Sequence, residues 1–93
     1  MLVLSRRLGE SLVINDQLVL TVAFLAEDYA ELSLINFSGS LLGTFTARVN
    51  EKLRLTDDIE VVAVRFEGGK VRLGVEGPAD CTFDRGEFWN LPS

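Results

Sequence analysis

The clearest strand pattern in the chain lies in Ile59-Glu-Val-Val-Ala-Val-Arg-Phe-Glu-Gly-Gly-Lys-Val-Arg-Leu-Gly-Val-Glu-Gly-Pro78. It contains two valine-rich runs separated by Gly68-Gly69. In the second run, apolar residues alternate with polar or small ones, as Val71, Leu73 and Val75 against Arg72, Gly74 and Glu76. A period of two is typical of a strand with one buried face, and a Gly-Gly pair between two such runs predicts a tight hairpin. The stretch therefore predicts two antiparallel strands.

The same alternation continues toward the N-terminus. The further apolar series are Leu2 and Leu4; Leu18, Leu20, Val22 and Phe24; and Ala30, Leu32 and Leu34. Residues that favour turns separate them, among them Asn15-Asp16, Ser38-Gly39 and Asp57-Asp58. Short strands at even spacing predict an all-β sandwich or barrel. A short helix or turn is expected only over about residues 85–89, before Pro92.

Length and composition indicate one domain, residues 1–93, with 47% hydrophobic residues. A single cysteine, Cys81, excludes a disulfide within the chain and favours a cytoplasmic protein. No apolar run is long enough to span a bilayer, so we expect no membrane association. Arg6-Arg7 follow the first apolar residues instead of preceding them, which is not the pattern of a signal peptide.

Catalysis has little support in the sequence. The chain has no histidine, which removes the commonest general base and the commonest metal ligand. Cys81 lies in a strand-like context that suits a small core residue better than a nucleophile. Gly68-Gly69 lacks the following Lys-Ser or Lys-Thr of a phosphate-binding loop. We therefore expect neither an enzyme nor a cofactor.

Charge constrains any binding of nucleic acid. The formal net charge is −5, from nine Lys and Arg against fourteen Asp and Glu. Phosphate contacts supply most of the non-specific affinity for nucleic acids, so the net charge alone argues against such a ligand. After Arg6-Arg7 the next basic residue is Arg48. A surface that binds anions must therefore be a local patch built from residues distant in sequence.

The chain also contains a faint internal repeat. A shift of forty-one residues aligns the two halves without a gap, as pseudo-repeats 1–41 and 42–93. The identities are Arg7 with Arg48, Glu10 with Glu51, Leu12 with Leu53, Asp16 with Asp57, and Leu32 with Leu73. Strand phase agrees as well, and a slip of one residue would reverse every face. The sequence therefore predicts two divergent copies of one unit in a single domain.

Two stretches carry a resemblance to a known family. The opening Met1-Leu-Val-Leu-Ser-Arg-Arg-Leu-Gly-Glu10 has an apolar strand, paired arginines and a Gly-Glu turn. The second stretch has a Val-Arg-Leu-Gly-Val strand, the Gly77-Pro78 bend and an Asp-Arg-x-Glu-Phe tail ending at Phe88. Together they resemble the carbon storage regulator (CsrA/RsmA) family. The resemblance implies an intertwined family-like sandwich or barrel, here made of two fused copies and hence a monomeric pseudo-dimer.

The resemblance also implies a function. Family members are translational regulators that bind GGA-containing loops in messenger leaders, and this chain is expected to do the same. Messenger leader hairpins are the expected partners, with small regulatory RNA and a protein antagonist as further candidates. The alternative interpretation is a protein-interaction module that keeps the fold and binds little or no RNA. Net charge favours that alternative, whereas the arginines of the family site favour RNA.

The resemblance implies a site that combines the first strand of one copy with the last strand of the other. Arg6, Arg7 and Arg85 are its candidate RNA contacts, because arginine can bond guanine O6 and N7 and stack on bases. The alternatives are a solvated strand end for the arginine pair and a salt bridge for Arg85. Neighbouring side chains on a strand point to opposite faces, so only one of Arg6 and Arg7 can point directly into the site. Leu4 shares the face of Arg6 and is expected either beneath a base or in the core.

Three further candidates come from the tail. Gly77 and Pro78 match the loop whose backbone lines the family site, although an ordinary turn explains them equally. Phe83 offers a face for stacking a base or packs in the core. In the second, equivalent site Ala47 stands in place of Arg6 and Thr44 in place of Arg85, and only Arg48 remains. One functional site per chain is therefore expected.

Overall fold

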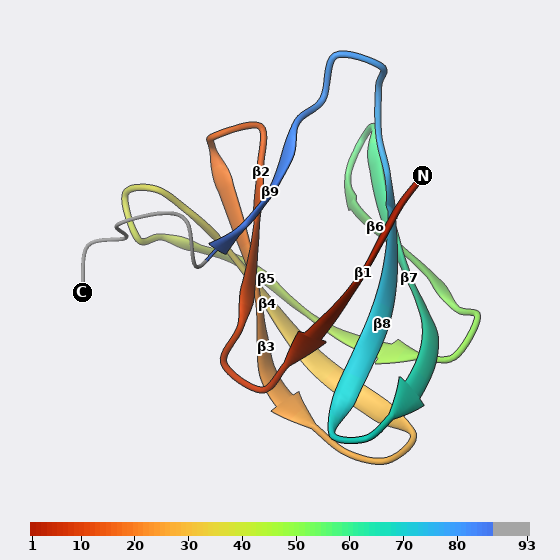
Figure 1. Ribbon diagram of the computed structural model, residues 1–93. Coiled ribbons are helices and arrows are strands. Elements are labelled where there is room, and N and C mark those ends of the chain that lie inside the picture. Colours follow the sequence, from red (N-terminus) through yellow and green to blue (C-terminus); the bar gives the residue numbers. More distant parts are fainter. Residues whose placement is uncertain (87–93) are drawn as a thin grey trace.

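The computed structural model describes residues 1–86, which form nine strands in two antiparallel sheets (Figure 1). The first sheet has the order β1 (Leu2–Arg7), β8 (Lys70–Glu76), β7 (Ile59–Glu67) and β6 (Lys52–Thr56). The second has the order β5 (Leu41–Arg48), β4 (Tyr29–Asn36), β3 (Leu18–Leu25), β2 (Ser11–Ile14) and β9 (Phe83–Arg85). The predicted all-β fold is confirmed.

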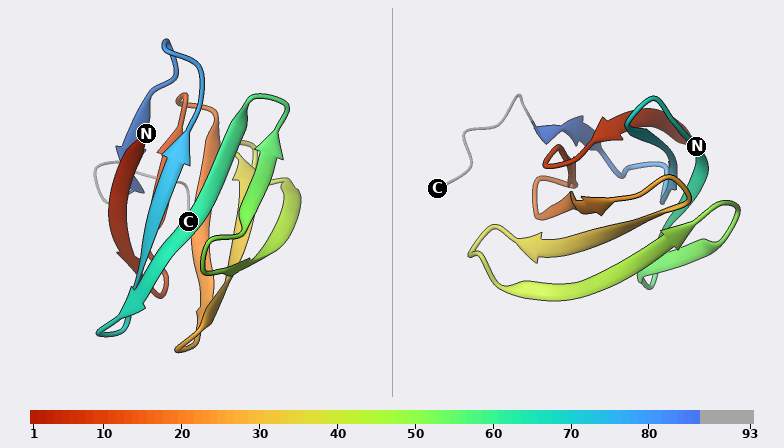
Figure 2. Two further views of the ribbon diagram at one scale, coloured as in Figure 1. Left: turned by 90° about the vertical axis from the view of Figure 1, so that its right-hand side faces the viewer. Right: turned by 90° about the horizontal axis from the view of Figure 1, so that it is seen from below.

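The two sheets lie as two layers around one core (Figure 2). Leu4 and Leu73 from the first sheet and Leu20, Leu32 and Leu34 from the second belong to the same buried cluster. Because alternate residues of each strand face this layer, the period-two pattern of the sequence becomes a shared apolar interior. Both halves of the chain therefore contribute to a single core.

Two turns contain residue types that tolerate a positive φ. Gly68 and Gly69 have φ of 61° and 72°, and Asn15 and Asp16 both have φ of 55°. Positive φ at both central residues is the geometry of the two-residue turn that matches strand twist, and Gly, Asn and Asp tolerate it best. The predicted hairpin between β7 and β8 is confirmed, and β2 and β3 form a second hairpin whose connection has three residues, between the paired Ile14 and Leu18.

Two bulges reverse the faces that simple alternation predicts. The pairing of β3 with β4 shifts between Val22 and Phe24, and the pairing of β7 with β8 shifts between Ala63 and Arg65. Phe24 is consequently 47% exposed, so its expected place on the core face with Val22 is wrong. In β7 the same change turns Phe66 toward the core and leaves Arg65 outside. An extra residue in one strand causes such a reversal.

The first and last described strands lie at the edges of different sheets, and each pairs with a strand that is distant in sequence. β1 pairs with β8, and β9 pairs with β2, so strands from opposite ends of the sequence lie side by side (Figure 1). Arg85 ends a strand, and the rest of the helix or turn expected over 85–89 lies outside the described residues, apart from Gly86. Within residues 1–86, no helix has the length and hydropathy needed to cross a membrane.

The strand orders of the two sheets are related by exchange of the two halves. Replacing β1, β6, β7 and β8 by β5, β2, β3 and β4 turns the order β1-β8-β7-β6 into β5-β4-β3-β2. Registers correspond too: Leu4 pairs with Leu73, and Phe45, forty-one residues later, pairs with Leu32. The amide of Gly9 donates to Val22 O at 2.8 Å, and the equivalent amide of Asn50 donates to Ala63 O at 2.9 Å. In the described residues β9 has no equivalent beside β6.

Candidate nucleic-acid interface

A groove of about 460 Å³ lies where the first and last described strands approach each other. We call it the terminal groove, and its lining residues are Val3, Leu4, Ser5, Arg6, Arg7, Glu10, Lys70, Arg72 and Arg85. Five of the nine basic residues of the chain line it, against one acid, Glu10. Positive charge is thus concentrated at one place in an acidic protein, and the residues that supply it come from distant parts of the sequence.

The two neighbouring arginines of β1 have different environments. Arg6 lies on the inner face with Leu4 and is only 4% exposed. Its Nε donates to Ser5 O at 2.8 Å and its Nη1 to Ser11 O at 3.2 Å. Arg7 lies on the outer face and is exposed. The expectation that Arg6 contacts RNA through its side chain therefore does not suit its burial, whereas Arg7 is free to reach a ligand.

Glu10 organises the turn that follows β1. Its Oε1 accepts a hydrogen bond from the amide of Arg7 at 2.7 Å and lies 3.9 Å from Nε of Arg6. The amide of Glu10 donates in turn to Arg7 O at 3.0 Å. Gly9 has φ of 85°, a conformation that glycine adopts without strain. The Arg-Arg-x-Gly-Glu motif therefore works as one unit that buries the first arginine and presents the second.

Arg85 reaches the groove from the other end of the chain. β9 pairs with β2, with Arg85 opposite Leu12, and the Arg85 side chain is exposed. The structure thus brings Arg85 and Arg7 to one groove, although β9 pairs with β2 and not with β1. Lys70 and Arg72, which sequence reasoning missed, come from β8, where they lie opposite Arg7 and Ser5. Had the pairing of β1 with β8 been predicted, the register would have placed Lys70 and Arg72 beside Arg7.

The other site residues predicted from the sequence lie in the core or in a turn. Leu4 is 6% exposed and belongs to the core, and Phe83 is half-buried against that core. Pro78 O accepts a hydrogen bond from the amide of Cys81 at 3.0 Å, which closes a turn. A Cβ on Gly77 would meet Cys81 Sγ at 3.3 Å. Gly77, Pro78 and Phe83 are not among the residues that line the terminal groove.

The equivalent place in the other half differs in chemistry. Ala47, in the position of Arg6, is fully buried opposite Ala30. Arg48, in the position of Arg7, stacks over the ring of Tyr29 at 5.1 Å from its centroid. Thr44 lies in β5 opposite Ser33 and away from β6, because all of β5 pairs with β4. In the described residues, no strand pairs with the outer edge of β6 as β9 pairs with β2.

Cys81 lies in the loop between β8 and β9 and is half-buried. Burial raises the pKa of its thiol, and the negative charges of Asp58 and Asp80 raise it further. A raised pKa keeps the thiol protonated and poorly nucleophilic at neutral pH. In the described part of the chain, no cluster of three or more His, Cys, Asp or Glu residues could hold a metal ion.

The structure is thus that of a small all-β protein in which two antiparallel sheets pack together and the first and last described strands line a basic groove. The chain belongs to the CsrA family, described as the global regulator protein family, whose model matches residues 44–91. The resemblance predicted from the sequence is thereby confirmed. No solved structure is significantly similar.

Three relatives illustrate the match, each a translational regulator CsrA. The protein of Hydrogenovibrio crunogenus is 43% identical over 43 residues, covering 46% of this chain and 61% of the relative. That of Rhodopirellula baltica is 42% identical over 41 residues, covering 44% and 59%. That of Clostridium botulinum is 36% identical over 45 residues, covering 48% and 62%. The chain thus spans about 60% of the length of these relatives.

Proposed function

We propose that this chain is an RNA-binding post-transcriptional regulator that takes GGA-type single-stranded loops of messenger leaders in the terminal groove. The observation that carries the proposal is the convergence of Arg7 and Arg85, from the two ends of the sequence, on one groove. The relatives named translational regulator CsrA support the same class of function. The acidic remainder of the surface leaves this groove as the favoured place for an anionic ligand.

The groove has the two kinds of group that recognition of a guanine-containing loop needs. The exposed guanidinium groups of Arg7 and Arg85 can each form a bidentate contact with O6 and N7 of a guanine. Lys70 and Arg72 stand beside them and can neutralise phosphates, which carry affinity but no sequence information. Arg6 and Glu10 fix the turn from which Arg7 extends, so we assign them a positioning role.

We further propose that the chain is a fused pseudo-dimer of two family-like copies. The exchangeable strand orders and the matching registers, forty-one residues apart, support two copies that complete each other within one chain. Covalent fusion removes the concentration dependence of assembly and lets each copy diverge. The loss of Arg6 and Arg85 equivalents at Ala47 and Thr44 is such a divergence.

A monomer in solution is the expected consequence of the fusion. Each sheet already contains strands from both halves, so a second chain is not needed to complete the core. Sedimentation equilibrium over a hundredfold range of concentration should give the mass of one chain throughout. A stable dimer at the lowest concentration would mean that the two halves do not complete each other.

The direct test of the function is a titration with an RNA hairpin that has GGA in its loop. We expect saturable binding of one RNA per chain, loss of affinity when the loop is changed to CCU, and weaker binding as salt rises. One RNA is expected because Ala47 and Thr44 stand in place of Arg6 and Arg85 at the second, equivalent site. A folded protein that binds both hairpins equally weakly would contradict the proposal and favour a protein-interaction module.

A further inference from the structure

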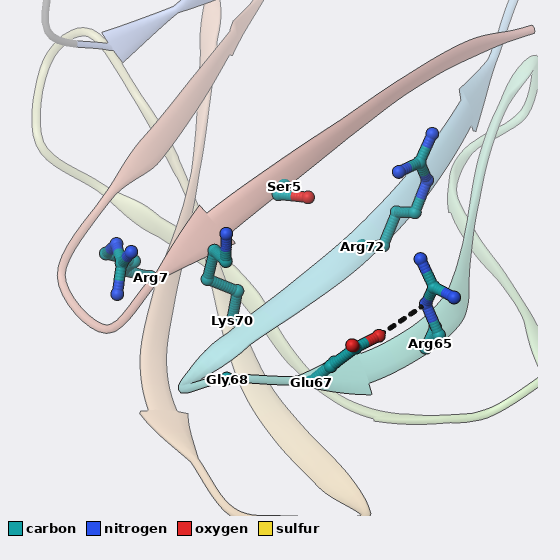
Figure 3. A pocket seen from close by; sticks show the side chains of 7 residues that line it. All are labelled: Ser5, Arg7, Arg65, Glu67, Gly68, Lys70 and Arg72. Carbon is teal, nitrogen blue, oxygen red and sulfur yellow. Dashed lines mark ion pairs between the residues drawn. The ribbon is translucent and has the colours of Figure 1, made fainter.

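A second basic pocket adjoins the terminal groove on the outer face of the first sheet. We call it the hairpin pocket; it has a volume of about 340 Å³ and lies beside the turn between β7 and β8 (Figure 3). Its lining residues are Ser5, Arg7, Arg65, Glu67, Gly68, Lys70 and Arg72. Ser5, Arg7, Lys70 and Arg72 line both cavities, so the two form one continuous basic surface.

Strand pairing forces the positive charges of this pocket together. Arg7 lies directly opposite Lys70, and Arg72 lies directly opposite Arg65. Like charges opposite each other on neighbouring strands destabilise a sheet. Glu67 offsets part of this repulsion, because its Oε2 lies 3.1 Å from Nε of Arg65. An anionic ligand would relieve what remains.

The fold itself does not require this charge. In the other half, forty-one residues earlier, Phe24, Tyr29 and Glu31 stand in place of Arg65, Lys70 and Arg72. The rings of Phe24 and Tyr29 lie 5.7 Å apart, and Glu31 accepts a hydrogen bond from Thr46 at 3.1 Å. The equivalent face therefore satisfies its polar groups within the protein, whereas the hairpin pocket concentrates cations.

We infer that the hairpin pocket is a phosphate-binding extension that holds the single-stranded RNA backbone next to the hairpin whose loop lies in the terminal groove. The inference rests on the proposed function, because the shared residues make both cavities parts of one track. Arg65 and its neighbours contact phosphates there, so the extension adds affinity for any flanking sequence. Glu67 limits that affinity by pairing with Arg65 in the free protein.

The test compares two RNAs, the GGA hairpin alone and the same hairpin with six uridines on each side. The parent protein should bind the extended RNA more tightly. Its plot of log affinity against log salt concentration should be steeper by about 0.7, because Arg65 is the one cation of the hairpin pocket that does not also line the terminal groove, and a cation contributes about 0.7 on a single strand. Arg65→Gln should reduce the slope for the extended RNA by about 0.7 and leave the slope for the plain hairpin unchanged.

Two further variants test whether Arg65 is the residue that contacts the added RNA. Glu67→Gln should strengthen binding of the extended RNA, because it frees Arg65 from its carboxylate partner. Arg54→Gln, which removes an exposed charge on β6 outside both cavities, is the matched control and should leave the difference between the two RNAs unchanged. Thermal unfolding first establishes that each variant is folded.

Failure of this inference is distinct from failure of the proposed function. Equal affinities and equal salt slopes for the two RNAs would overturn the phosphate-binding extension and leave the loop site intact. A preference for the extended RNA that survives Arg65→Gln undiminished would also overturn it, since the flank would then lie elsewhere. Absence of binding to either RNA would overturn both proposals together.

Discussion

Arg7→Ala and Arg85→Ala are each expected to weaken binding of the GGA hairpin by about 1–3 kcal/mol, the usual contribution of a bidentate contact to a base. This corresponds to a rise in Kd of about 5-fold to 150-fold. Both side chains are exposed at the same groove, so neither substitution removes a core contact. Fluorescence anisotropy with a labelled hairpin at fixed salt measures the change.

The two substitutions should also couple. Residues that share a ligand are not independent, so the double variant should lose less or more than the sum of the single losses by at least about 0.5 kcal/mol. Arg54→Ala on β6 provides the control, because Arg54 is exposed and does not line the groove. If Arg85→Ala binds the hairpin as tightly as the parent, the terminal groove is not the RNA site.

Arg6 is less suited to such a substitution, because its side chain is buried. Its guanidinium is buried and bonded to the backbone of Ser5 and Ser11, so its removal takes away a hydrogen-bond donor from each of two carbonyl oxygens and opens a space in the interior. Such a loss destabilises the protein and would lower RNA binding through unfolding as well as through the site. The sequence contained a signal for this, because Arg6 shares its strand face with Leu4, and Leu4 is a core residue.

The sequence predicted those parts of the fold that depend on local chemistry. Gly68-Gly69 predicted a tight turn, and both residues have the positive φ of such a turn. The alternation through Val71 and Leu73 predicted one buried strand face, and both side chains are buried. The approach of the first and last described strands was expected from the family resemblance, not from periodicity. It is nevertheless what brings Arg85 to the groove of Arg7.

The bulges are what the sequence did not reveal. Simple alternation from Ala63 puts Arg65 on the core face, but the shift in pairing after Ala63 turns it outward, opposite Arg72. Arg65 therefore lines the hairpin pocket and does not serve as a neutral control for RNA binding. A bulge changes faces without any residue pattern of its own at these positions, so the hairpin pocket could be seen only once register was known.

Leu32→Ala is expected to lower the free energy of unfolding by about 2–5 kcal/mol, the usual cost of truncating a buried leucine. Leu32 is fully buried between the sheets, opposite Val22 on one side and Phe45 on the other. The free energy of unfolding of a folded domain is about 5–15 kcal/mol in total, so the variant should lose a large share of its stability. Urea unfolding followed by circular dichroism measures the loss as a lower midpoint.

Leu73→Ala should have an effect of the same size, because Leu73 stands forty-one residues later in the same buried cluster. Leu41→Ala, at a side chain that is 62% exposed, should change stability by no more than about 0.5 kcal/mol. Both core variants should unfold in one cooperative transition, because the strands of each half complete the sheet of the other. Two separate transitions, with Leu32→Ala shifting one and Leu73→Ala the other, would mean that the halves fold as independent units, against the fused pseudo-dimer.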